Sequence, residues 1–245
     1  MANLRSTDPA PMTGPSAGLS GRRRVQAFGF GGLLLVLMNF SAPDAGMIDL
    51  PVSFFLKNRM HLQANELAVF KLWIGIPLIL GFVFGFIRDR WSPFGRGDRA
   101  HILLFGLLTA FIYGLMALMT PSYAMFLGGR CVATMAFKMV SSAVYGVINT
   151  LAQKHAVTGQ MSSLIMMGTM LPCLISCIGG GMLSQTLGGQ NAEAAARVLF
   201  FCAGGLMVSI AVLGFIGPEW VFNEARDEVP TVHFMAALRR IARPW

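Results

Sequence analysis

Charged residues are scarce in this sequence. Only 12% of its 245 residues are Asp, Glu, Lys or Arg, whereas 55% are hydrophobic. This composition excludes an ordinary soluble domain, which carries about 25% charged residues. A helix needs about 20 mainly apolar residues to cross the hydrocarbon core of a bilayer. The chain has six such runs, at 25–48, 66–87, 101–120, 122–148, 162–187 and 197–217. We therefore expect an all-α, polytopic membrane protein with six transmembrane helices.

Cysteine and histidine are also rare, with four residues of each type. The cysteines all fall in predicted spans, where a thiol behaves as a small apolar group. Neither residue type shows the spacing of a disulfide framework or a zinc site. The glycines at 179–181 lie within a span and follow no strand, so they do not form a phosphate-binding loop. We expect neither an enzyme nor a bound metal or cofactor.

The net charge of +8 is unevenly distributed along the chain. If the N-terminus is cytoplasmic, 13 of the 19 Lys and Arg residues lie on the cytoplasmic side, four lie outside, and Arg130 and Lys138 lie within the fourth span. This asymmetry follows the positive-inside rule and predicts a protein of the inner (plasma) membrane with both termini cytoplasmic. Because membrane topology explains the positive charge, we expect no nucleic-acid partner. A secretory leader is disfavoured because the first apolar run continues past Asp44 without a convincing cleavage site.

The same pattern divides the chain into three parts. Residues 1–21, rich in Pro, Ser and Gly, predict a disordered cytoplasmic tail, and 22–217 form the six-helix transmembrane domain. Residues 218–245 predict a cytoplasmic segment that is amphipathic at 232–243 and suited to the membrane surface.

Three charged residues fall at membrane depth: Asp44, Arg130 and Lys138. Each costs about 2.5–3.5 kcal/mol to insert, so each needs a partner or a purpose. We predict that Asp44 pairs with Arg130 in the outer third of the bilayer and that Lys138 lies deeper. They would form a polar, substrate-binding wall that favours an anionic or strongly hydrogen-bonding solute. The other residues of this wall would be Asn39, Ser141, Ser142 and Tyr145. Alternatively, Asp44 and Arg130 merely neutralise each other while Lys138 reaches towards the membrane surface.

The run "GFIRDRWSPFGRGDR" after the second span concentrates arginine at its cytoplasmic end. A negative Asp89 at a helix C-terminus is disfavoured by the helix dipole and needs nearby compensation. The run resembles the loop motif of major facilitator superfamily transporters, on six residues: Gly85, Asp89, Arg90, Gly95, Arg96 and Arg99. Pro77, twelve residues before the aspartate, makes it similar to the folate–biopterin transporter and muropeptide permease branches. Gly81 and Asp98 depart from those branches, which carry a lysine and a basic residue there.

This resemblance implies that the chain is the N-terminal six-helix half of such a transporter. The motif would then latch two halves together on the cytoplasmic side. The implied function is secondary active transport of an organic solute, with proton symport as the default and Asp44 as the carrier. A second six-helix half would come from a homodimer, a partner chain or a longer protein.

A second hypothesis is a non-transporting subunit or assembly factor of a larger membrane complex. It would use small residues on two spans to approach other helices closely. These residues are Gly75, Gly81 and Gly85 in the second span, and Gly168, Ser176, Gly180 and Ser184 in the fifth. The alternative explanation of both stripes is packing within the six-helix unit.

Overall fold

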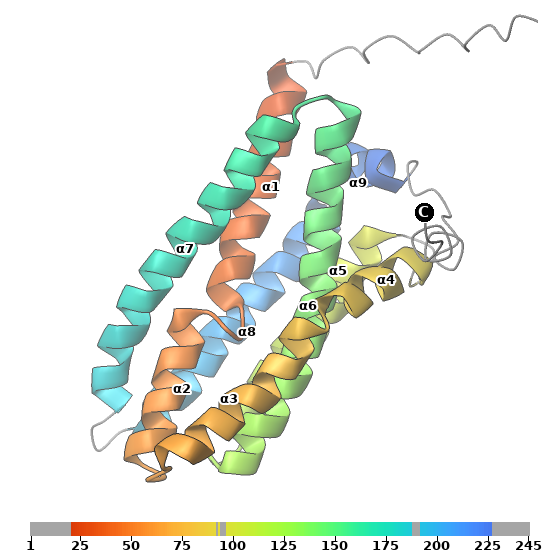
Figure 1. The fold of residues 1–245 in the computed structure, drawn as a ribbon. Helices are drawn as coiled ribbons and strands as arrows, with labels where there is room; N and C mark the ends of the chain where they lie inside the picture. The colour runs from red at the N-terminus through yellow and green to blue at the C-terminus, as the bar shows by residue number, and fades with distance from the viewer. Residues whose placement is uncertain (1–20, 92, 94–96, 188–191, 227–245) are drawn as a thin grey trace, which may run out of the picture.

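Helices make up nearly all of the chain that the computed structural model describes, which is residues 21–91, 93, 97–187 and 192–226 (Figure 1). The helices are α1 (Gly21–Ser41), α2 (Gly46–Asn58), α3 (Ala64–Ile79), α4 (Gly81–Arg90), α5 (Asp98–Leu118), α6 (Tyr123–Lys154), α7 (Thr158–Leu187), α8 (Ala192–Ile216) and α9 (Glu219–Arg226). This part of the chain contains no β-strand, which confirms the predicted all-α class.

Within the described residues, six helical segments are long and apolar enough to cross a membrane, as the sequence predicts. They are Gly21–Asn58, Ala64–Arg90, Asp98–Leu118, Tyr123–Lys154, Thr158–Gln185 and Ala196–Ile216, which we call spans 1 to 6. Span 4 continues six residues beyond the predicted boundary at 148, because "TLAQK" favours helix and Leu151 and Ala152 are buried. Span 1 continues to Asn58 after an interruption at 42–45.

The start of α1 and the short helix α9 lie at the same end of the bundle (Figure 1). We call this the inner end, after the side that the arginine distribution predicts, and the opposite end the outer end. Residues 1–20 and 227–245 lie outside the described residues. The predictions of a disordered tail and of an amphipathic stretch at 232–243 therefore stay predictions.

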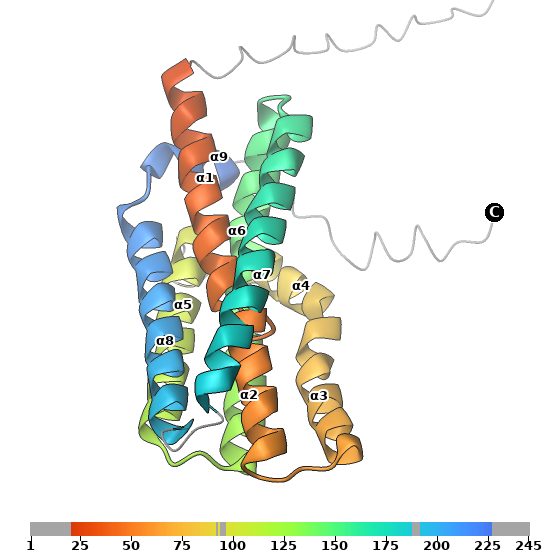
Figure 2. The ribbon, with the colours of Figure 1, turned by 90° about the vertical axis from the view of Figure 1, so that its left-hand side faces the viewer.

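The spans form two layers. One layer contains four spans, in the order 5, 1, 4 and 2 (Figure 1). In this layer α7 of span 5 packs on α1 and α2 of span 1, and α3 and α4 of span 2 pack on α6 of span 4. Helices α5 and α8 pack tightly against each other and cover the other side (Figure 2). Spans 2 and 5 therefore stand at the flanks and are the least buried of the six. Span 4 lies inside the unit and is the most buried.

Span 1 is broken in its outer half, and other spans bind the backbone groups that the break frees. The Tyr113 hydroxyl donates to the carbonyl of Ser41 over 3.0 Å, and the Arg130 guanidinium donates to the carbonyl of Pro43. Within the break, the Ala45 N–H donates to the Ala42 carbonyl over 2.9 Å. Irregular backbone is tolerated at membrane depth only when protein or water satisfies it. Here α5 and α6 supply the partners.

The small residues of spans 2 and 5 behave differently. In span 5 they pack within the unit: a Cβ at Gly180 would lie 2.1 Å from the Gly46 carbonyl oxygen, and one at Gly168 would lie 2.9 Å from the Leu35 Cβ. The expectation that span 5 exposes its small residues to another protein is therefore wrong. In span 2, added Cβ atoms at Gly75, Gly81 and Gly85 would meet no atom within 4 Å.

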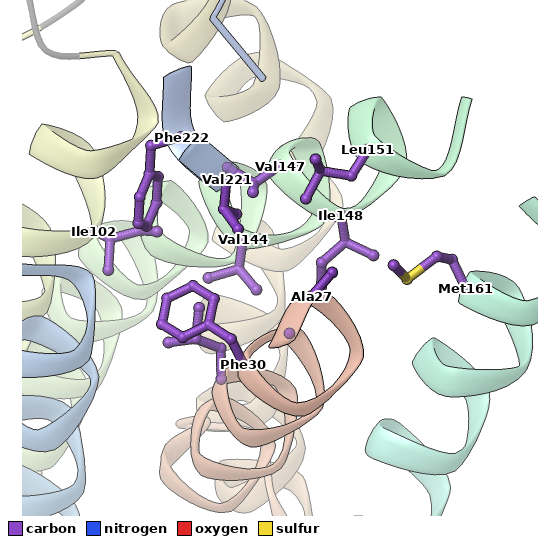
Figure 3. Close-up of a pocket in the computed structure, with 12 residues that line it drawn as sticks. Ala27, Phe30, Ile102, Val144, Val147, Ile148, Leu151, Met161, Val221 and Phe222 are labelled. Carbon is purple, nitrogen blue, oxygen red and sulfur yellow. The ribbon is translucent and has the colours of Figure 1, made fainter. Parts of the chain in front are cut away.

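Helix α9 closes the inner end of the bundle. Its Val221 and Phe222 cover a small apolar cavity that side chains of α1, α5, α6 and α7 line (Figure 3). The Phe222 ring meets the Phe30 ring edge to face at 5.9 Å, a favourable geometry for aromatic pairs. The His155 Nε2 and Glu224 Oε2 atoms lie 2.8 Å apart and join the end of α6 to α9. The described part of the predicted C-terminal segment is thus a docked helix.

Candidate functional site

Three charged side chains meet in the outer half of the bundle, one from each of spans 1, 2 and 4. Asp49 of α2 accepts a hydrogen bond of 2.8 Å on Oδ1 from the Arg130 Nη2 and binds the Lys71 ammonium on Oδ2. We call Asp49, Lys71 and Arg130 the outer triad. It holds two cations and one anion. A single carboxylate therefore links three spans and leaves one positive charge in excess.

The three side chains of the outer triad differ in how far they are buried. The Arg130 side chain is only 1% exposed, whereas the side chains of Asp49 and Lys71 are 25% and 39% exposed. Arg130 also donates from Nη2 to the Pro43 carbonyl, but its Nε and Nη1 atoms are buried without a hydrogen-bond partner. Because a buried charge is stable only when it is paired, Asp49 is essential to holding Arg130 in the bundle.

The predicted pair between Asp44 and Arg130 is wrong. Asp44 lies in the break of span 1, where its side chain is exposed and forms no ion pair or hydrogen bond with the described part of the chain. The reason is local geometry. The break ends at Ala45, and the new helix α2 carries Asp49 in its first turn, where the helix dipole favours a carboxylate.

Lys138 lies half-way along α6, on a face that the other helices leave partly open. Ser142, Tyr145 and Asn149 follow it at intervals of three and four residues, and all three are partly or fully exposed. We call these four residues the polar stripe of α6. The Lys138 ammonium forms no ion pair or hydrogen bond with the described residues. Lys138 and Tyr145, two residues of the predicted polar wall, therefore lie on one face of α6.

Asn39 does not join this stripe. Its amide nitrogen donates to the Leu35 carbonyl within α1 over 2.8 Å and to the Gly168 carbonyl of α7 over 3.3 Å. These bonds occupy the amide in packing span 1 against span 5. The structure thus places Lys138 and Tyr145 on one face of α6 and Asn39 between spans 1 and 5. Arg130 binds the carbonyl of Pro43, next to Asp44, but the two charges form no ion pair.

The loop after span 2 is organised by a pair that the motif does not include. Arg88, in the last turn of α4, donates from Nε and Nη2 to the two carboxylate oxygens of Asp98 over 2.5 and 2.7 Å. Asp98 is in the first turn of α5, so both charges lie at the helix end that favours their sign. The guanidinium also fills the space over Gly146 of α6, where an added Cβ would lie 2.1 Å from its Cζ.

The motif residues themselves are more exposed. The Asp89 side chain is 57% exposed and lies 3.4 Å from the Arg88 Nη1, and Arg90 lies over the Phe86 ring. Gly85 has open space around it. Gly95 and Arg96 lie outside the described residues. Their predicted gating role stays a prediction.

Arg99 is tied within the six-helix unit. It donates from Nε to the Gly214 carbonyl over 3.1 Å and from Nη2 to the Phe215 carbonyl, and its Nη1 lies 3.6 Å from Glu219. These carbonyls belong to the last turn of α8, which needs donors because no further turn follows. Arg99 therefore caps span 6 and contacts α9. These contacts occupy its guanidinium within the six-helix unit, so in this arrangement Arg99 is not available to bind a second half.

Sequence reasoning did not include Asp49 in the site, because the predicted first span ends at residue 48 whereas the helix continues to Asn58. Counted at 1.5 Å per residue from the outer helix ends at Asn58, Ala64 and Tyr123, Asp49, Lys71 and Arg130 all lie roughly 10–14 Å deep. Equal depth would have suggested that they meet.

For metal binding, the described residues offer no group of three or more His, Cys, Asp and Glu side chains that could hold an ion.

The model of the BT1 family matches residues 44–236, which is most of the chain. The chain belongs to the BT1 family. BT1 is a transporter family in the group related to the major facilitator superfamily, and the six apolar helices fit it. Neither a curated protein nor a solved structure matches the chain.

Membership of the BT1 family fixes the broad function. The chain is a multi-pass membrane protein of a transporter family, which indicates transport and not catalysis. The matched range begins at the break of span 1 and includes the outer triad, the polar stripe of α6 and α9.

Proposed function

We propose that this BT1-family chain is one half of a secondary active transporter that moves an organic anion by alternating access. In this mechanism two repeats rock against each other around a site near the middle of the bilayer. The layer formed by spans 5, 1, 4 and 2 would be one wall of that site, and a second six-helix half would be the other. That half would come from a second copy, a partner chain or a longer protein.

The observation that carries the proposal is Lys138. It lies at the centre of the longest single helix, on an incompletely covered face, and no described carboxylate neutralises it. A lysine at this depth costs about 2.5–3.5 kcal/mol to insert. A bound anion would offset that cost, and Ser142 and Tyr145 on the same face would add hydrogen bonds to the solute.

The flanks of the wall support a second half. Span 2 carries open glycines at 75, 81 and 85, and span 5 exposes an apolar face that includes Met166, Met170 and Leu174. Both flanks stand where two halves of a transporter of this type would meet. The motif around Asp89 would then latch them at the inner end. We propose the plasma membrane as the location, with both chain ends cytoplasmic.

Uptake into proteoliposomes tests the proposal. The protein is purified from its native membrane in mild detergent, so that any second half is retained, and reconstituted. Folate is the first solute to try, because it is an organic anion and the loop motif resembles the folate–biopterin branch. Uptake of an anionic solute by the wild type should fall at least tenfold in Lys138→Gln. The matched control is Lys57→Gln, which removes an exposed lysine at the outer end of α2.

Two results would contradict the proposal. One is unchanged uptake in Lys138→Gln. The other is a stable complex with unrelated membrane proteins that carries no organic solute. The second result would favour the subunit hypothesis.

A further inference from the structure

We propose that Lys71 is an exchangeable anion-binding residue at the outer mouth of the transport path. In the resting state Asp49 is its counter-ion, and an incoming carboxylate or phosphate group takes the place of Asp49. This inference rests on the proposed transport function, which it extends by naming the residue that first meets the solute. Lys71 belongs neither to the loop motif nor to the polar stripe of α6.

The charge balance of the outer triad is the first support. Two cations share one carboxylate, and they bind its two oxygens separately. If Lys71 leaves, Asp49 remains neutralised by Arg130. If Arg130 left instead, a cation would be stranded in the interior of the bundle. Lys71 is therefore the partner that can be exchanged, and once it leaves Asp49 its ammonium needs another anion.

The unpartnered atoms of Arg130 are the second support. Arg130 binds Asp49 through Nη2 alone, and its buried Nη1 has no hydrogen-bond partner. When Lys71 turns away, the carboxylate of Asp49 can offer its second oxygen to Nη1. Arginine and carboxylate groups favour this two-bond geometry. Asp49 thus gains one hydrogen bond as it loses another, which lowers the free-energy cost of releasing Lys71.

The position of Lys71 is the third support. Its side chain is the most exposed of the triad. Helix α3 packs chiefly on α6 and only slightly on α2, and Figure 2 shows α2 and α3 standing apart in the outer half. The ammonium of Lys71 bridges this separation to reach Asp49. Counted at 1.5 Å per residue, Lys71 lies roughly 10 Å from the outer end of α3 and Lys138 roughly 22 Å from the outer end of α6. An anion that arrives from the outer end therefore meets Lys71 before Lys138.

Charge-selective thiol labelling tests the inference without knowledge of the solute. Gly75 is one helical turn after Lys71 on the same face, and a Cβ there meets no other atom. The full chain, with its four native cysteines replaced by alanine and with Gly75→Cys, is kept in proteoliposomes. Its labelling rates are measured with two methanethiosulfonate reagents of similar size. One carries an ethylsulfonate group (negative) and the other an ethyltrimethylammonium group (positive).

Removing one positive charge about 6 Å from the thiol should lower the ratio of anionic to cationic labelling about tenfold. Lys71→Gln should show this fall, Lys71→Arg should preserve the ratio, and Lys57→Gln should not change it. A ratio that stays within twofold in Lys71→Gln would overturn the inference. So would a thiol that reacts with neither reagent, because Lys71 would then lie beyond the reach of anions in water.

The same preparations separate this inference from the proposed function. If labelling depends on Lys71 but no variant transports any solute, the transport proposal fails and anion binding by Lys71 stands. If the wild type transports an anion and Lys71→Gln matches it in both uptake and labelling ratio, only the role of Lys71 fails. Monodisperse elution of each variant confirms that it has folded.

Discussion

A methyl group added at Gly146 should destabilise the inner end of the bundle. The Cβ of Gly146→Ala would lie 2.1 Å from the Cζ, Nη1 and Nη2 atoms of Arg88. Carbon atoms in favourable contact lie about 3.5–4.0 Å apart, so the guanidinium must retreat by roughly 1.5 Å. Its hydrogen bonds to Asp98, now 2.5 and 2.7 Å long, would then lengthen to about 4 Å and break.

The magnitude follows from the burial of this pair. The Arg88 and Asp98 side chains are 14% and 11% exposed, so each loses a partner in a poorly solvated place. Breaking a fully buried pair costs about 3–5 kcal/mol. Arg88 can partly recover by turning to solvent and to Asp89, which reduces the cost to about 2–3 kcal/mol. The higher helix propensity of alanine offsets up to about 1 kcal/mol. A net loss of about 1–3 kcal/mol remains.

The assay is thermal unfolding in detergent, with Gly128→Ala as the matched control. Gly128 lies on the same helix, and its added Cβ meets nothing within 4 Å, so that variant should be as stable as the wild type or slightly more so. In an Arg88→Ala background, Gly146→Ala should lose its penalty, because no side chain then fills the space. Equal stability of the two glycine variants, or a penalty that persists without the arginine, would refute the reasoning.

Three further outcomes are expected. Asp49→Asn should lower the yield of folded protein and reduce the stability by about 3–5 kcal/mol, because it leaves the buried charge of Arg130 without a counter-ion. The control Asp44→Asn should change neither, and equal yields of the two variants by size-exclusion chromatography would contradict this. Ala156 has φ 53°, in the left-handed region where glycine is unstrained, so Ala156→Gly should raise the unfolding temperature by an amount equivalent to about 1 kcal/mol; a lower temperature would show that this strain is absent. Asp89→Asn should reduce uptake in proteoliposomes while leaving the unfolding temperature unchanged, since the Asp89 side chain is mostly exposed. Normal uptake would show that Asp89 does not act in the predicted latch.

Much of the fold could be predicted because lipid imposes a simple rule on the sequence. Six apolar runs of sufficient length predicted six helical spans, and the described residues confirm them. The break in span 1 was also foreseeable, since Pro43 and Asp44 interrupt an apolar run. The continuation of that span to Asn58 was not, because "KN" at its end is polar and resembles a loop. Helix α2 is held there by packing against α7, which composition does not reveal.

The candidate site was harder to predict because it depends on which residues share a face and a depth. The sequence shows that Arg130 needs a partner, and Asp44 is the acid within the predicted first span. The true partner, Asp49, lies five residues later on a separate helix, and the turn between the two helices decides the matter. Likewise, Asp98 looked like a departure from an all-basic run. In the structure it is the acid that anchors Arg88.

The broken first span carries a consequence for biogenesis. The carbonyl groups at its interruption are bound by Tyr113 and Arg130, which the ribosome synthesises about 70 and 90 residues after the break. Until the third and fourth spans have entered the bilayer, the nascent first span has no partners for these groups. It must wait beside the insertion machinery or keep contact with water. Assembly of this protein is therefore expected to be coupled to translation, with completion of the fourth span as the step that commits the first to lipid.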